Sequence, residues 1–144
     1  MPRPRSTPVQ ILLVEDSRDD ADLMREALNE GALDVRVSLV EDGEAALAFL
    51  RREGVYSASP RPDLILLDLM LPRMNGEEVL EVIKAEHDLR HIPVVVLTSA
   101  NGEETFVHAY NLHANCCVSK PMNQEQYART VKQIERFWLN IAEL

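Results

Sequence analysis

The sequence lacks several residue patterns that define large classes of proteins. Its 2 cysteines, Cys116 and Cys117, are adjacent, and neighbouring Cα atoms lie about 3.8 Å apart, inside the roughly 4.4 Å minimum of ordinary disulfides. We expect both to be reduced, which excludes a disulfide scaffold. The 5 glycines are dispersed, and even the closest two, Gly43 and Gly54, are 11 positions apart. This excludes GxGxxG turns, Walker loops and GxSxG elbows, which need clustered glycines.

Positive charge and long apolar runs are also scarce. With 15 Lys+Arg against 24 Asp+Glu, the formal net charge is −9, and this charge repels nucleic acid phosphates and anionic lipid. We therefore expect neither nucleic acid nor a membrane as a direct partner. No apolar run approaches the about 20 residues that span a bilayer, and the opening MPRPRSTP does not resemble a secretory signal peptide. A cytoplasmic protein is expected.

What the sequence does contain is one alternating pattern. Its 144 residues suffice for a single domain with a real core, so we expect a flexible N-terminal arm over 1–8 and one domain over 9–144. Short β-branched apolar runs predict strands at Val9–Val14, Val35–Val40, Leu64–Leu67, Val94–Leu97 and Cys116–Ser119. Amphipathic segments between them predict helices from Ser17 to Gly31, Gly43 to Glu53, about 75–87, about 102–112 and from about 123 onward.

This alternation predicts an α/β fold. Nearly continuous apolar strands separated by helices are typical of a doubly wound, five-stranded parallel sheet with right-handed crossovers and helices on both faces. In such sheets, ligands bind beyond the carboxyl ends of the strands, where the strand order reverses. The residues that follow the strands are therefore the candidates for function.

Polar residues stand at four of these strand ends. Glu15 and Asp16 follow the first strand, Asp68 the third, Thr98 the fourth and Lys120 the fifth. Convergent carboxylates without histidine or thiolate form a hard oxygen site suited to Mg²⁺. A lysine and a hydroxyl opposite them match the needs of a transferred phosphoryl group. A carboxylate can itself be the nucleophile, forming an aspartyl phosphate.

Simpler interpretations exist for single residues. Acidic residues at a helix start usually cap the helix or interact with its dipole. We assign that role to Asp19, Asp20 and Asp22. Taken alone, Asp68 is equally compatible with the opening of a turn, and Thr98 with a helix cap. Only the joint pattern favours a site.

Four segments resemble, in order, the signatures of the receiver domain of two-component response regulators. They are LLVEDSRDDADL, LILLDLMLPRMNGEEVL, PVVVLTSA and VSKPM, within about residues 9–135. The resemblance implies a flavodoxin-like sheet with strand order 2-1-3-4-5 and five helices, the last extended beyond the usual family end. It also implies a phosphorylation switch, in which Asp68 accepts a phosphoryl group from a sensor histidine kinase in a Mg²⁺-dependent reaction.

The resemblance further implies a set of metal ligands. Asp16 and Asp68 would bind Mg²⁺ through their carboxylates, Glu15 through a water molecule and Met70 through its backbone carbonyl.

The resemblance assigns the reacting group to Asp68, Thr98 and Lys120. Asp68 corresponds to the phosphoryl acceptor, Thr98 to the switch hydroxyl and Lys120 to the lysine of the family pattern. Cys117 departs from the pattern, because the family usually places an aromatic switch residue there. We therefore expect a weaker coupling between the hydroxyl and this position.

Two other function classes fit less well. A phosphatase of the dehalogenase type needs a second aspartate two residues after its nucleophile, and Met70 occupies that position. An adaptor that is never phosphorylated would not require the complete set of polar strand-end residues. We therefore expect a signalling protein and not an enzyme with a separate substrate. Too few residues follow the fifth strand for a DNA-binding output domain, so signalling by protein contact is expected.

Two further features imply partners. The loop YSASPRPD and the terminal FWLNIAEL are similar to small regulators that partner bacterial phytochromes, which implies a bacteriophytochrome as the kinase. The last helix carries an apolar stripe at helical spacing, and one receiver is expected to leave its end exposed. A homodimer through the fourth helix, fifth strand and last helix is therefore predicted. The stripe comprises Tyr127, Val131, Ile134, Phe137, Trp138, Ile141 and Leu144.

Overall fold

The computed structural model describes residues 8–98 and 114–142. The strands are β1 (Val9–Val14), β2 (Val35–Val40), β3 (Leu64–Asp68), β4 (Val94–Thr98) and β5 (Cys116–Ser119). The helices are α1 (Arg18–Glu30), α2 (Gly43–Arg51), α3 (Gly76–Ala85) and α5 (Gln124–Ala142), with a short 3₁₀ turn at Gly54–Tyr56. The helix expected at about 102–112 and most of the expected N-terminal arm lie outside the described residues.

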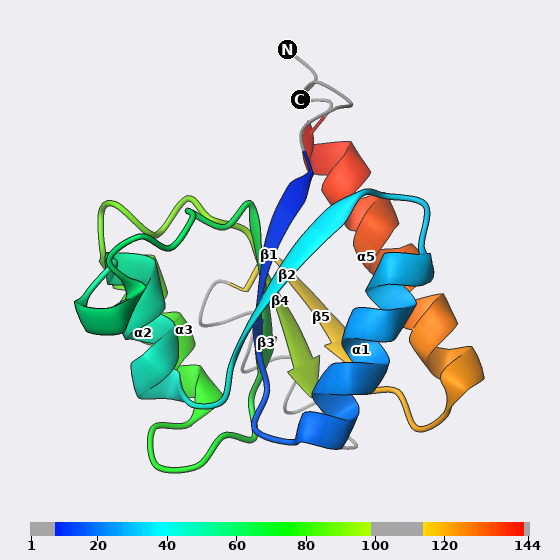
Figure 1. The fold of residues 1–144 in the computed structure, drawn as a ribbon, viewed down its shortest axis with the longest axis horizontal. Coiled ribbons are helices and arrows are strands. Elements are labelled where there is room, and N and C mark those ends of the chain that lie inside the picture. The colour runs from blue at the N-terminus through cyan, green and yellow to red at the C-terminus, as the bar shows by residue number, and fades with distance from the viewer. Residues whose placement is uncertain (1–7, 99–113, 143–144) are drawn as a thin grey trace.

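The strands form one parallel sheet of the predicted topology. Their order is β2-β1-β3-β4-β5, so the flavodoxin-like arrangement is confirmed. Helices α1 and α5 cover one face and α2 and α3 the other (Figure 1). The order reverses between β1 and β3, because the chain leaves β1 toward β2 on one side and returns to β3 on the other. Ligands of such sheets bind at this switch point.

Each face of the sheet has its own hydrophobic core, because side chains along a strand alternate between the faces. Leu12 and Leu67 pack with Phe49 and Leu80 on the α2 and α3 side. On the other side, the core comprises strand residues such as Ile11 and Leu66 together with Met24, Leu28, Val131 and Ile134 of α1 and α5. The central strands β3 and β4 are buried along their whole length. The sheet is therefore a rigid support for the residues at its carboxyl edge.

Helix α2 ends two residues before the predicted Glu53. Arg52 adopts a left-handed conformation with φ 55°, and the N–H of Glu53 closes the helix by donating to the Ala48 carbonyl over 2.9 Å. Gly54, just beyond this end, also has a positive φ, of 58°. A glycine adopts this conformation without strain.

The end of α5 corrects one expectation. Trp138 was expected to face water unless a second copy covered it, yet it is 8% exposed and belongs to the α1 and α5 core. Trp138 shares this core with Val9 of β1 and Leu28 of α1, and α5 lies alongside α1 (Figure 1). Phe137 is half-buried against the same core, and Leu144 lies outside the described residues. Among the described helices, none, including α5, has the length and apolar character needed to cross a bilayer.

Candidate functional site

The register of the sheet brings the polar strand ends together. Val14 of β1 pairs with Leu67 of β3, so the next residues, Glu15 and Asp68, lie side by side at the switch point. Asp68 pairs with Leu97 of β4, which places Thr98 one step beyond. Thr98 pairs with Ser119 of β5, and the N–H of the following Lys120 donates to the Thr98 carbonyl over 2.8 Å.

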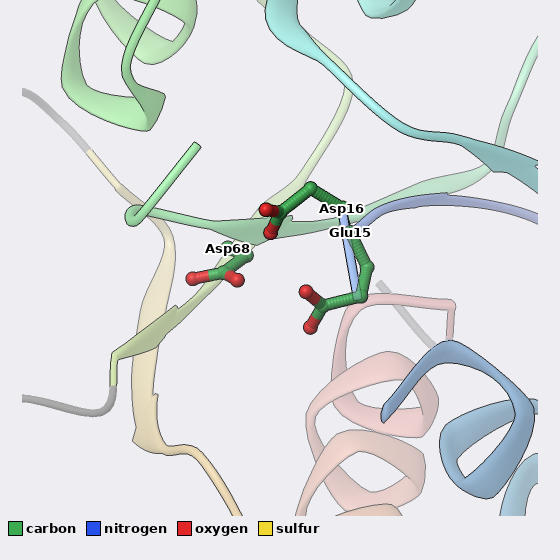
Figure 2. A group of neighbouring side chains, drawn as sticks. All are labelled: Glu15, Asp16 and Asp68. Carbon is green, nitrogen blue, oxygen red and sulfur yellow. The ribbon is translucent and has the colours of Figure 1, made fainter. Parts of the chain in front are cut away.

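Three carboxylates converge at this edge. Figure 2 shows the side chains of Glu15 and Asp16, from the end of β1, and of Asp68, from the end of β3, directed toward a common space. One oxygen from each lies within 4.8 Å of the others. Glu15 is 3% exposed and Asp68 1% exposed, whereas Asp16 is exposed. The predicted acidic group is therefore assembled, with two members buried and one open to solvent.

Lys120 contacts two members of this group. Its Nζ lies 2.9 Å from Glu15 Oε1 and 3.0 Å from Asp68 Oδ2. A third carboxylate, Asp20 Oδ2 in the first turn of α1, lies 3.1 Å from the same nitrogen. Because an ammonium group has three N–H donors, these contacts saturate it.

Asp20 is the residue of this group that sequence reasoning misassigned. Its N–H does take part in helix capping, because it donates to the Ser17 Oγ over 3.3 Å, but its carboxylate also binds Lys120. The same carboxylate lies beside the Tyr127 side chain of α5 and raises the pKa of that tyrosine. No local signal distinguishes it from Asp19 and Asp22, since all three lie at one helix start and the partners come from the other end of the chain.

Burial and charge shift the pKa values in this group. Desolvation by burial, with the Asp68 charge adding to it, raises the pKa of Glu15 to about 7 even though Lys120 and the Ser17 N–H act in the opposite direction. Burial alone would lower the pKa of Lys120, but hydrogen bonds and charges from Glu15 and Asp68 outweigh it and raise that pKa. Lys120 is therefore a permanent cation, while Glu15 titrates near neutrality in the metal-free protein.

The raised pKa of Glu15 predicts an unusual pH dependence of stability. Between its ordinary value of 4.5 and about 7, the folded state binds more protons than the unfolded state, so the free energy of unfolding falls as pH rises. In EDTA, we expect a loss of about 2–3 kcal/mol between pH 5 and pH 8. Urea unfolding at several pH values measures it. Glu15→Gln should flatten the profile and Glu81→Gln, on the exposed face of α3, should not; equal profiles for all three proteins would contradict the assignment.

The loop after β3 is built around Asp68. Asp68 Oδ1 accepts the N–H of Met70 over 2.9 Å, which turns the chain sharply beside the carboxylate. Asn75 caps α3 by accepting the Glu78 N–H over 2.9 Å. A Cβ on Gly76 would lie 2.5 Å from the Asp68 carbonyl oxygen, so only glycine lets α3 begin this close to the strand. The start of α3 therefore packs directly against the backbone of Asp68.

Two further sequence features have clear places. Thr98 is 1% exposed at the end of β4. Cys116 and Cys117 pack on opposite faces of the sheet, as expected for neighbours in a strand, and both are free. Burial raises the pKa of the Cys117 thiol to about 11. Cys117 is therefore a neutral packing residue at the position where the family pattern has an aromatic residue. The Lys120–Pro121 bond is trans.

The donor set determines what this site can bind. Converging carboxylates with no thiolate or imidazole among them suit a hard divalent cation, and a cation would relieve the repulsion between two buried acids. Within the acidic group, Asp68 contacts the ammonium of Lys120 over 3.0 Å. With the Lys120 ammonium and a bound cation beside it, the Asp68 carboxylate can accept an anionic group, because both positive charges offset the added negative charge.

Comparison with known proteins agrees with this geometry. The family model of the response regulator receiver domain matches residues 11–132. Response regulator Rcp1 of Synechocystis sp. (strain ATCC 27184 / PCC 6803 / Kazusa) is 47% identical over 137 residues, which cover 95% of this chain and 93% of Rcp1. This similarity spans nearly the full length of both chains.

Solved structures extend the comparison. The phosphorylated cyanobacterial phytochrome response regulator RcpA has a TM-score of 0.85 at 47% identity, covering 92% of this chain and 95% of RcpA. The Mn²⁺-bound form of Rcp1 has a TM-score of 0.83 at 48% identity, with 92% and 95% covered. Motifs, strand order, site geometry and these similarities agree, and the chain belongs to the response regulator receiver domain family.

Proposed function

We propose that this receiver domain is a phosphorylation switch that takes a phosphoryl group onto Asp68. The observation that carries the proposal is the position of Asp68, which is 1% exposed at the switch point, beside the carboxylates of Glu15 and Asp16 and 3.0 Å from Lys120 Nζ. Incubation with Mg²⁺ and a small acyl phosphate should add one phosphoryl group to the intact mass. An unchanged mass would overturn the proposal.

The reaction follows from these side chains. An Asp68 carboxylate oxygen attacks the phosphorus, the bond from phosphorus to the donor's histidine nitrogen breaks, and an acyl phosphate forms on Asp68. Lys120 neutralises the charge that arrives with the phosphoryl oxygens, because its Nζ already contacts Asp68 Oδ2. Thr98 is proposed as the hydroxyl that binds the group after transfer. Cys117, smaller than an aromatic ring, weakens the response at the usual switch position.

The acidic group is proposed as a Mg²⁺ site. Asp16, Asp68, Glu15 and the backbone carbonyl of Met70 are the proposed ligands, with Glu15 acting through water. Bound Mg²⁺ supplies positive charge that offsets the phosphoryl oxygens during transfer. The hard oxygen donors and the short distances between them support this choice.

The partners are proposed from the family and from the relatives. A receiver domain takes its phosphoryl group from a sensor histidine kinase in the cytoplasm, and RcpA is a phytochrome response regulator, so a bacteriophytochrome-type kinase is the proposed donor. Residues 1–8 are proposed as a flexible arm and 9–144 as the receiver domain with its extended helix. We also propose that the protein signals by contact with other proteins and does not catalyse a reaction on a separate substrate.

A homodimer through the fourth helix, β5 and α5 also belongs to this proposal. Trp138 no longer supports it, since its own domain buries that side chain. What supports it is the exposed side of β5 and α5, where β5 forms an edge of the sheet. There, half-buried Cys116 and Cys117 line a hollow with the exposed Arg129 and Gln133. A twofold pairing of such faces is the most common closed arrangement.

Charge substitutions on two sides of α5 test the dimer. Arg129→Glu with Gln133→Glu places extra negative charge beside β5, and we expect it to convert a dimer into monomers because the like charges meet across the twofold axis. The control, Lys132→Glu with Ala128→Glu, makes the same total charge change on the side facing α1. Light scattering at micromolar concentration measures the masses. A monomeric starting protein, or a dimer that survives the first pair of substitutions, would contradict this interface.

A further inference from the structure

The contacts of Lys120 divide into two kinds. Two of its acceptors, Glu15 at 2.9 Å and Asp68 at 3.0 Å, belong to the carboxylate group that fits a divalent cation. The third, Asp20 at 3.1 Å, does not belong to that group. A bound cation would therefore compete with the Lys120 ammonium for Glu15 and Asp68. It would not compete for Asp20.

Asp20 lies where α1 and α5 meet. Its backbone N–H is fixed in the first turn of α1 by Ser17, and its carboxylate lies beside the Tyr127 side chain of α5. Tyr127 is 4% exposed and lies in the core shared by α1 and α5, so its hydroxyl has a defined position. Burial, with Asp20 adding to it, raises the pKa of Tyr127 to about 12, which keeps the hydroxyl a donor.

From these contacts we infer that Asp20 and Tyr127 are positioning residues for Lys120. The pair holds the ammonium beside Asp68 whatever the state of the other carboxylates, and the inference rests on the proposed phosphoryl transfer to Asp68. A lysine side chain is a flexible four-carbon stem. The end of β5 fixes the backbone of Lys120, but it does not fix the position of the ammonium group at the other end of the side chain. Displacement of about 1 Å from the reacting centre can slow a reaction by about a hundredfold.

The alternative is a purely structural role for the pair. Asp20 is 38% exposed in its side chain, so it has water available as a partner and does not need Tyr127 or Lys120 for solvation. Loss of the Tyr127 hydroxyl leaves the ring to pack in the core. A structural role therefore predicts little change at Asp68 when the hydroxyl is removed, and a positioning role predicts a slower reaction.

Single-atom changes separate these roles. Tyr127→Phe and Asp20→Asn are compared with two controls, Tyr56→Phe, which removes a hydroxyl from a half-buried ring packed on Phe49, and Asp19→Asn, which removes an exposed acid from the same helix turn. Phosphorylation by a small acyl phosphate in Mg²⁺ is followed by intact mass. We expect the rate constant to fall about three- to tenfold in either test variant, with no further loss in the double variant because both act through Lys120.

Two readouts distinguish this inference from the proposed function. The Mg²⁺ dissociation constant should change less than twofold in Tyr127→Phe, because neither positioning residue is a proposed ligand. Solvent exchange of the Lys120 ammonium protons, followed by NMR without any phosphoryl donor, should become faster in Tyr127→Phe and Asp20→Asn only. A starting protein that is never phosphorylated refutes the proposed function, while unchanged exchange and unchanged rates in the variants refute the positioning role.

Discussion

Asp68→Asn is expected to abolish phosphorylation completely. The amide of asparagine carries no negative charge and is a poor nucleophile, while its size and its contact with the Met70 N–H are preserved. Intact mass after incubation with Mg²⁺ and a small acyl phosphate should show the added group in the starting protein and none in the variant. Asp88→Asn, which changes an exposed aspartate in the turn after α3, should label as fully as the starting protein.

Two outcomes would contradict this assignment. A phosphorylated Asp68→Asn protein would show that another residue is the acceptor. Undiminished labelling of the starting protein in EDTA would show that the carboxylate group next to Asp68 does not act through a divalent cation.

Lys120→Met is expected to have the largest effect on stability. Glu15 and Asp68, at 3% and 1% exposed, would lose the cation that both contact, and uncompensated buried charge costs about 3–5 kcal/mol. Loss of Lys120 also raises the pKa of Glu15 further, so the folded state takes up a proton and the cost is smaller at low pH. The deficit should therefore grow as pH rises from 5 to 8.

Urea unfolding in EDTA and in excess Mg²⁺ measures this effect. We expect Mg²⁺ to restore most of the lost stability, because a ligand that binds only the folded state raises the free energy of unfolding, and we expect the variant to bind Mg²⁺ at least as tightly as the starting protein. Lys132→Met, which changes an exposed lysine of α5, should stay within about 0.5 kcal/mol. A Lys120→Met protein as stable as this control, or one with weakened Mg²⁺ binding, would contradict the proposed role of Lys120.

The sheet and the strand-end residues were predictable because their signals are local. Apolar runs such as Leu64–Leu67 indicate a buried strand by composition alone, and the carboxyl ends of parallel strands meet at one edge. Glu15, Asp68, Thr98 and Lys120 therefore had to lie near one another once the parallel sheet was assumed. The register confirms their proximity.

The same local signals misled at two positions. Asp20 follows a capping serine and does act in that turn, so nothing in the sequence around it indicates the ion pair with Lys120, 100 positions away. The helical spacing of Trp138 correctly indicates an apolar face, but periodicity does not reveal what covers that face. Its own domain covers it, because Trp138 belongs to the core that also contains Val9 and Leu28.

The sequence by itself thus determined the parallel α/β fold, the order of its elements and the edge where the polar strand ends gather, because hydrophobic periodicity and strand polarity are local properties of the chain. The tertiary structure alone decided that Asp20 pairs with Lys120, that Glu15 is buried enough to titrate near neutrality, and that the domain itself buries the apolar stripe of α5 as far as Trp138. These features depend on the distance and burial of groups brought together by helix packing, which no spacing along the chain encodes.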